Sequence, residues 1–282
     1  MNDYKKILLL NYSCPSGVID LFGTAGGLNE FKASLLASHG FTVLSLAYFG
    51  FDDLPKMLPY CEMEYFEEAA DWLVKHPAVI PSGIGVMGVS KGAEITLMMA
   101  IHCKDIIKAI VPISSSYIIS AVPFKHKGKL SGSYYDTSQV MVNEDGACIF
   151  RYCIPVRGLE KVNPPVVIPV EEINCPMLLV CGEDDESASA SGMAQEILSR
   201  MNLHSKGDLC SIVSYPGTGH LIEPPFSPHC YASYHKTFKI NFAWGGNSKD
   251  HSRAQEDSWR KILEFFTKNL QKSNSQTLSS HL

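Results

Sequence analysis

Residues Ile84–Gly92, with the sequence IGVMGVSKG, give the clearest indication of the fold. An apolar run typical of a buried strand leads directly into Gly88-Val89-Ser90-Lys91-Gly92, and a small, apolar, helix-like segment follows. Glycines at the flanking positions let the backbone make a sharp strand-to-helix turn, which holds the serine in a strained conformation above the end of a sheet. The pattern therefore predicts that Ser90 is a nucleophile.

The context of Ser90 carries this prediction, because the three fixed residues of a G-x-S-x-G pattern also recur by chance. The alternative is a serine that only caps a helix after a strand. At a helix N-terminus, free backbone N–H groups and the helix dipole favour developing negative charge. A serine nucleophile needs a base, and the base needs a carboxylate that fixes its tautomer, so the rest of the chain has to supply both.

Short apolar runs alternate along the chain with segments of helical period, as in a buried, mostly parallel central sheet flanked by helices. The expected strands are Ile7–Leu10, Val18–Leu21, Thr42–Ala47, Ile84–Gly88, Ala109–Ser114, Met177–Cys181 and Cys210–Ser214. The expected helices are Leu28–Ser38, Met63–Lys75, Lys91–Cys103 and Ser258–Leu270. With the turn at Ser90, this order predicts an α/β-hydrolase fold.

Residues 115–170 interrupt the alternation and form an irregular insertion after the sixth strand of such a fold. They are rich in Gly, Pro, Tyr and charged residues and lack a long periodic segment. Ligands of open α/β sheets bind outside the carboxyl ends of the strands, so an insertion here is placed to form a lid or a pocket wall. An ordinary surface loop is the alternative.

The acid and the base are expected in loops that follow later strands, in the chain order Ser, Asp or Glu, His. An acidic loop, EDDE at residues 183–186, follows one expected strand, although such loops are also commonly just solvated. Spacing alone does not separate Asp184 from Asp185. His220 follows the next strand after a glycine-bearing turn, and it is the one of the ten histidines in the expected position.

Such a site also needs two backbone N–H groups for the oxyanion of a tetrahedral intermediate. One is expected from Lys91, the residue after the nucleophile, and the other from the loop FGTAGG at residues 22–27, where Thr24 is the expected donor. A glycine-rich loop after a strand also occurs in nucleotide-binding proteins. The GxGxxG spacing and the Walker lysine are both lacking here, which argues against that alternative.

Composition excludes several other classes of function. A net charge of −5 and a pI near 6.1 leave no basic stripe for a phosphate backbone, so no nucleic-acid partner is expected. The nine cysteines are odd in number and form no CxxC pair, which indicates neither a disulfide framework nor a zinc cage and favours a reducing compartment. No apolar run reaches the roughly 18 residues of a membrane span. We expect neither a metal nor a cofactor.

The chain also carries six collinear blocks: IDLFGTAGGLNEFKASLLASHGF, LAYFGFDDLP, GVSKGAEITLMMA, CGEDD, YPGTGHLIEPPFSP and AQEDSWRKILEFF. Together they resemble the catalytic domain of type I acyl-CoA thioesterases, a family that includes the bile-acid-CoA:amino-acid N-acyltransferases. The resemblance implies an α/β-hydrolase that cleaves acyl-CoA to free acid and coenzyme A through a covalent acyl-enzyme. It also points to Asp185 beside Ser90 and His220.

The resemblance separates two activities at the nucleophile. The acyltransferase branch is expected to carry cysteine at the position of Ser90, and a serine ester attended by a base is readily hydrolysed. The expected activity is therefore hydrolysis of fatty acyl-CoA by a serine thioesterase of lipid metabolism, with transfer to glycine or taurine as the alternative.

The resemblance also predicts the domain organisation. Family members carry a further N-terminal β-sandwich domain, whereas about sixteen residues precede the match here. The chain therefore resembles an isolated catalytic domain at residues 17–270, preceded by an N-terminal remnant or short edge strand at residues 1–16. A truncated binding or regulatory protein without catalytic activity is a further alternative.

Two polar segments lie outside these blocks. Residues 271–282 are predicted to be a flexible tail, and its end, Ser280-His281-Leu282, resembles the SKL-type signal that a peroxisomal import receptor recognises. A peroxisomal location is expected, with the cytoplasm as the alternative. Lys125, Lys127 and Lys129 are candidates for contacts with the phosphates of coenzyme A, although a solvated basic loop is the more common reason for such a cluster.

Overall fold

The computed structural model describes residues 7–8 and 15–270. Its centre is a seven-stranded sheet in the order β1-β3-β2-β5-β6-β11-β12, in which every neighbouring pair is parallel except β1 with β3. The strands are β1 (Ile7–Leu8), β2 (Gly17–Leu21), β3 (Thr42–Leu46), β5 (Ile84–Val89), β6 (Ile107–Ile113), β11 (Met177–Gly182) and β12 (Cys210–Tyr215).

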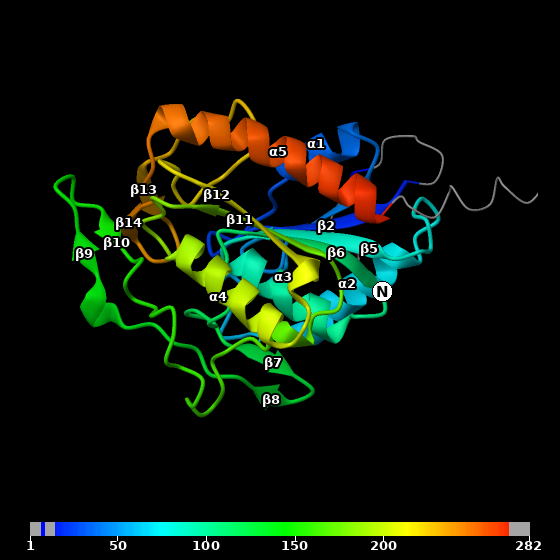
Figure 1. Ribbon diagram of the computed structural model, residues 1–282, viewed down its shortest axis with the longest axis horizontal. Helices are drawn as coiled ribbons and strands as arrows, with labels where there is room; N and C mark the ends of the chain where they lie inside the picture. Colours follow the sequence, from blue (N-terminus) through cyan, green and yellow to red (C-terminus); the bar gives the residue numbers. More distant parts are fainter. Residues whose placement is uncertain (1–6, 9–14, 271–282) are drawn as a thin grey trace, which may run out of the picture.

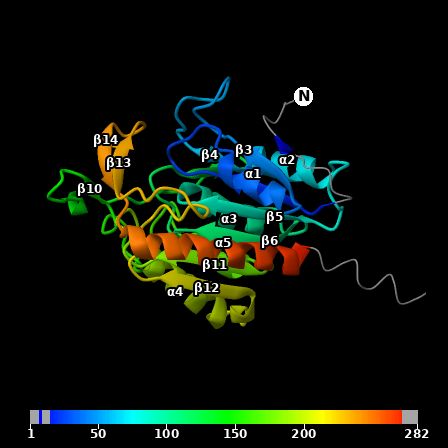
Figure 2. The same ribbon diagram turned by 90° about the horizontal axis from the view of Figure 1, so that it is seen from above.

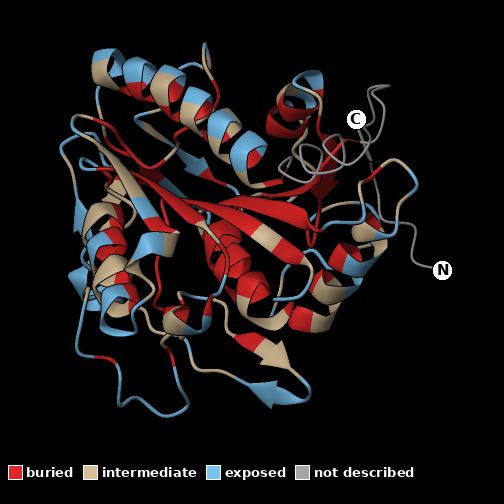
Figure 3. Cartoon of the chain, turned by 45° about the vertical axis from the view of Figure 1, so that its right-hand side comes forward, coloured by how far each residue is buried: buried red, intermediate tan, exposed pale blue. Residues whose placement is uncertain are grey.

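Helices cover both faces of this sheet (Figure 1). One face carries α1 (Phe31–Ser38) and α5 (Ser248–Leu270), and the other carries α2 (Met63–Val74), α3 (Lys91–His102) and α4 (Ala190–Leu203). Because both faces are covered, the central strands are buried along their whole length (Figure 3).

Alternate side chains of each strand feed two separate apolar cores. In β5, Ile84 and Val86 belong to the core under α2, α3 and α4, whereas Met87 and Val89 point to the core under α1 and α5. This two-sided burial explains the continuous apolar run that precedes Ser90. It holds the end of β5, and therefore the turn that follows, on a rigid support.

The structure confirms the predicted α/β-hydrolase architecture and corrects several boundaries. The helix expected at Ser258–Leu270 begins at Ser248, because its polar first turns still bury His251, Ala254 and Gln255. The helix expected from Leu28 begins at Phe31, and α4 was not predicted. The last two residues of the expected strand Ile7–Leu10 lie outside the described residues.

The insertion contains short strands that the sequence did not reveal: β7 (Phe124–His126), β8 (Lys129–Leu130), β9 (Met141–Val142) and β10 (Cys148–Ile149), together with the 3-10 helix η1 (Thr137–Gln139). β10 pairs with β14 (Ile240–Ala243), whose hairpin partner is β13 (Ala232–His235). These form a four-stranded sheet, β13-β14-β10-β9, beyond one end of the central sheet (Figures 1 and 2).

A third sheet joins the insertion to the helical layer. It has the order β4-β7-β8, where β4 (Cys61–Glu62) immediately precedes α2. Two 3-10 helices, η2 (Val170–Glu172) and η3 (Gly207–Leu209), complete the described elements. In the described part of the chain, no helix combines the length and the hydropathy that a membrane crossing requires.

Candidate active site

Ser90 lies at the turn between β5 and α3 with a strained backbone, φ 57° and ψ −120°. Its N–H donates to the carbonyl of Ile113 on the neighbouring strand, at 3.0 Å. The flanking glycines are required by close backbone approach: a Cβ at Gly88 would clash with the carbonyl of Gly92, and one at Gly92 would lie 2.6 Å from the carbonyl oxygen of Phe22. The turn therefore has the predicted form, with the strain at the serine itself.

Asp185 and His220 come from the loops after β11 and β12, and the structure brings them into contact. Nδ1 of His220 lies 2.7 Å from Oδ2 of Asp185, and their side chains are 2% and 1% exposed. The other oxygen of Asp185 accepts the N–H groups of Ser187 and Ala188, each at 2.8 Å. Asp184 is exposed, so the geometry selects the second aspartate of the pair.

The position of His220 is fixed by its backbone and by its ring. Its N–H donates to the carbonyl of Trp244 at 2.8 Å, and its carbonyl accepts the hydroxyl of Ser114 at 2.7 Å. The ring stacks on Trp244, with centroids 5.6 Å apart and planes 16° apart. The backbone of His220 is therefore fixed on both sides, and its imidazole is oriented by Trp244 and Asp185.

Nε2 of His220 is buried and has no hydrogen-bond partner among the described residues. His220 and Ser90 line the same cavity of about 320 Å³. A buried nitrogen without a hydrogen-bond partner costs free energy, and such atoms are concentrated at functional sites. A general base needs a free lone pair of this kind to accept a proton. This arrangement can therefore deprotonate a hydroxyl at the cavity wall.

The expected oxyanion donors also lie beside Ser90. Lys91 is the first residue of α3, where backbone N–H groups have no acceptor within the helix. A Cβ at Gly23 would lie 3.1 Å from Cβ of Ser90, so the loop after β2 runs directly past the nucleophile. Thr24 follows Gly23 and lines the same cavity as Ser90, while its hydroxyl lies 3.2 Å from Nε2 of His235.

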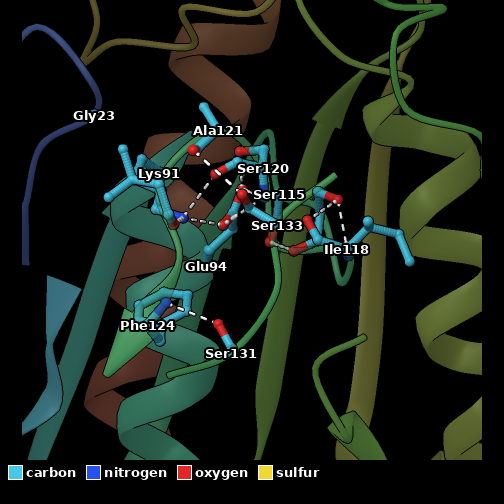
Figure 4. A network of polar contacts seen from close by, with 12 residues as sticks. Gly23, Lys91, Glu94, Ser115, Ile118, Ser120, Ala121, Phe124, Ser131 and Ser133 are labelled. Carbon is cyan, nitrogen blue, oxygen red and sulfur yellow. Dashed lines mark hydrogen bonds and ion pairs between the residues drawn. The ribbon is translucent and has the colours of Figure 1, made fainter. Parts of the chain in front are cut away.

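The side chain of Lys91 has a separate role, shown in Figure 4. It is buried, forms an ion pair with Glu94 at 2.6 Å and donates to the carbonyls of Ser120 and Val122 at 3.0 and 2.5 Å. Glu94 in turn accepts the N–H and the hydroxyl of Ser120. Burial raises the pKa of Glu94, and the Lys91 charge opposes the rise. This network fixes the start of the insertion to the helix behind the nucleophile.

The cavity wall is mostly apolar and comes from two distant parts of the chain. The insertion contributes aromatic and aliphatic residues, and so does the segment around β14; these residues are Tyr135, Phe150, Ile154, Phe238, Ile240 and Phe242. Small hydroxyl side chains, two alanines, Glu94 and His220 line the remainder. Such a wall suits an apolar chain whose polar end lies near Ser90.

A second cavity of about 260 Å³ also borders Ser90 and His220. It is lined by the loop after β2, by Trp244 and by β13 with the adjoining Lys236. The site therefore has two spaces that meet at the nucleophile. Lys125, by contrast, is not among the lining residues of either cavity; on β7 it forms an ion pair at 3.0 Å with Glu62 of the neighbouring strand β4.

Comparison with known proteins identifies the family of this site. Residues 61–272 match the family model described as "BAAT / Acyl-CoA thioester hydrolase C terminal". The chain belongs to this family. The resemblance predicted from the sequence is thereby confirmed.

Two curated members of the BAAT / acyl-CoA thioester hydrolase family illustrate its range. Acyl-coenzyme A amino acid N-acyltransferase 2 of Mus musculus is 41% identical over 261 residues, which cover 92% of this chain and 61% of that protein. Acyl-coenzyme A thioesterase 1 of Homo sapiens is 38% identical over 257 residues, which cover 90% of this chain and 60% of that protein. The chain thus spans about three fifths of the length of these relatives.

Solved structures with low sequence identity support the fold of this family member. Acylaminoacyl peptidase of Pyrococcus horikoshii has a TM-score of 0.59 and 14% identity, covering 94% of this chain and 39% of that chain. An α/β hydrolase from Penicillium sp. sh18 has a TM-score of 0.53 and 16% identity, covering 92% and 91%. At this identity the likeness shows the α/β-hydrolase fold alone.

Several residues of the candidate site were not predicted from the sequence. Trp244, Ser114 and Glu94 each contact a predicted site residue or line its cavity. Ser114 carried one signal, since it ends an expected strand at the edge where the site lies. Trp244 and Glu94 carried none, because only the tertiary fold brings them to the site.

Proposed function

We propose that the chain is an acyl-CoA thioesterase that hydrolyses fatty acyl-CoA through an ester on Ser90. The observation that supports this most is the buried, unpartnered Nε2 of His220, held by Asp185 in the cavity that Ser90 borders. Relatives named acyl-coenzyme A thioesterase, at 38% identity, support the thioester substrate.

In the proposed first half-reaction, Oγ of Ser90 attacks the thioester carbonyl while Nε2 of His220 accepts the hydroxyl proton. The carbonyl oxygen becomes negative and accepts the backbone N–H groups of Lys91 and Thr24. The carbonyl carbon–sulfur bond then breaks, and the imidazolium returns the proton to the departing coenzyme A sulfur. Asp185 stabilises the imidazolium through Nδ1.

In the second half-reaction, water attacks the ester on Ser90, and His220 removes a proton from that water. The ester bond breaks, Ser90 regains its proton from His220 and the free acid leaves. The apolar cavity receives the acyl chain. The second cavity, where Lys236 offers a positive charge, receives the coenzyme A side.

Transfer of the acyl group to an amino acid is the second candidate activity. Relatives named acyl-coenzyme A amino acid N-acyltransferase are 41% to 43% identical to this chain. Serine at position 90 favours water as the acceptor, because an oxygen ester attended by a base is readily hydrolysed. We therefore place hydrolysis first.

The test is release of coenzyme A thiol from a panel of acyl-CoAs, with glycine and taurine added and the products analysed by mass. Hydrolysis predicts free acid with or without the amines, whereas an amide product would favour the acyltransferase. Ser90→Ala is expected to lower turnover about 10³-fold or more. Ser38→Ala, an exposed serine at the end of α1, is the control and retains turnover. A folded wild-type chain without any thiol release would favour a non-catalytic binding or regulatory protein.

We also propose that residues 17–270 are the catalytic domain and that the chain is peroxisomal. The peroxisomal proposal rests on Ser280-His281-Leu282, which lies outside the described residues, and on a 37% identical relative named peroxisomal succinyl-coenzyme A thioesterase. Another relative, 38% identical, is named mitochondrial. Deleting Leu282 from a tagged chain should abolish peroxisomal import, and unchanged import would contradict the proposal.

A further inference from the structure

Three potential metal ligands meet far from Ser90, at the other end of α3. They are Glu67 on α2, His102 at the last position of α3 and His126 on β7. Their ligand atoms lie within 4.8 Å of one another. Nε2 of His126 lies 3.0 Å from Oε1 of Glu67, and the two imidazole rings have centroids 4.1 Å apart.

This cluster is separate from the proposed catalytic machinery. Ser90 precedes the first residue of α3, and His102 is its twelfth and last residue. At a rise of about 1.5 Å per residue, the helix separates the two by about 18 Å. None of the three ligands lines either cavity at the nucleophile.

His102 is the member of the cluster that lacks a hydrogen-bond partner in the described part of the chain. Its imidazole has no hydrogen bond among the described residues and only contacts the ring of His126, with an angle of 49° between the two planes. A neutral imidazole has a lone pair on one ring nitrogen, which is the atom that a metal ion binds.

We propose that Glu67, His102 and His126 bind one Zn²⁺ ion, with water as the fourth ligand. Imidazole nitrogens and a carboxylate oxygen are ligands that zinc takes in proteins, at about 2.0–2.2 Å. A tetrahedron with such bonds separates its ligand atoms by about 3.3–3.6 Å. Glu67 and His126 are already close to this separation, and His102 needs only a small side-chain movement.

The surrounding charges permit a dication. On the β7–β8 hairpin, Lys125 pairs with Glu62 at 3.0 Å, and the carboxylate of Glu64 accepts the backbone N–H of Lys127 at 2.6 Å, which places a further negative charge beside the hairpin. Glu67 supplies a negative charge directly to the ion. Zinc would take the place of the hydrogen bond between Glu67 and His126, because both ligand atoms need a free lone pair to bind the metal.

The role of the ion follows from the elements that it joins. β7 follows Val122, whose carbonyl accepts the buried Lys91 side chain, so this strand is the continuation of the segment anchored behind the nucleophile. Zinc would link β7 to α2 and α3 in addition to the β4–β7 strand pair. The ion therefore stabilises the fold and takes no part in thiol release.

The test compares three forms of the full chain by Zn²⁺ titration calorimetry in a buffer that keeps cysteines reduced. The wild type is expected to bind one Zn²⁺ that the double variant His102→Ala/His126→Ala lacks, with at least a hundredfold weaker affinity in the variant. The matched control is His39→Ala/His204→Ala, which removes two exposed histidines at helix ends and binds like the wild type. All three forms keep every cysteine, so any Zn²⁺ bound by thiolates contributes equally to each titration.

Two further readouts guard against a variant that simply misfolds. Glu67→Gln keeps the size of the side chain and a hydrogen bond to His126, and it should weaken Zn²⁺ binding while the chain remains folded by circular dichroism. Co²⁺ should give the visible absorption of a tetrahedral site in the wild type and in the histidine control only. Equal Zn²⁺ affinity in the wild type and in the double variant, or no high-affinity binding by the wild type, would overturn the proposal.

Discussion

The nucleophile turn and the cavity wall opposite it are built in different ways. At the turn, Gly88 and Gly92 let backbone pack directly on backbone, and β5 beneath it is buried on both faces. The wall comes from irregular parts of the insertion and from the segment around β14, far along the chain, and the two-residue strand β10 connects these parts by pairing with β14. The difference suggests that the chemistry stands on the rigid sheet, whereas the shape of the acyl pocket depends on a more weakly supported wall.

Asp185→Asn is expected to have the largest effect on the sheet side of this comparison. The amide keeps the shape of the side chain but no longer stabilises the imidazolium, so thiol release should fall by about 10²- to 10⁴-fold. Asp184→Asn, at the exposed neighbouring position, is the matched control and should leave turnover nearly unchanged. Equal losses in the two variants would mean that the geometry selects the wrong carboxylate.

Glu94→Gln tests the link between the two regions. The substitution leaves the Lys91 ammonium buried without its counter-charge, which should cost about 3–5 kcal/mol in the free energy of unfolding. Glu196→Gln is the control, because its partner Arg157 in the insertion is 73% exposed, and such pairs contribute at most about 1 kcal/mol. Urea denaturation measures both. A loss as small as the control's would show that the insertion is held by other contacts.

The sequence predicted the sheet side of the molecule well, because its signals are local. The strand before Ser90, the two glycines and the loops that carry Asp185 and His220 can each be recognised from a few neighbouring residues. The choice between Asp184 and Asp185 came only from the family resemblance, since burial is a tertiary property. The structure distinguishes the two aspartates directly, because Asp185 contacts His220.

There is a physical reason why the cavity wall could not be predicted from the sequence. β9 and β10 have two residues each, too few to show an alternating pattern, and β10 gains its parallel partner only when the chain folds. Trp244, which directly follows β14, likewise contacts His220 only in the folded chain. Pairings over such a distance leave no local signal in a single sequence.

Glycine substitutions should show a smaller difference between the two regions. A Cβ at Gly92 would meet the backbone at the end of β2, so Gly92→Ala should cost about 1–3 kcal/mol of stability and displace the loop that follows, beside Ser90. Gly146, between β9 and β10, has no atom within 4 Å of an added Cβ but has a φ of 78°, so Gly146→Ala should cost about 1 kcal/mol. Thermal unfolding measures both. Activity should fall only in Gly92→Ala, and a larger loss in Gly146→Ala would reverse the proposed difference.

An acyl-enzyme on Ser90 is tested most directly by the mass of the chain when it is acid-quenched during the first turnovers with an acyl-CoA. The chain is expected to gain one acyl group, located by peptide mapping on the segment that contains Ser90 and absent from Ser90→Ala. An acyl group on another residue, or undiminished thiol release by Ser90→Ala, would contradict it.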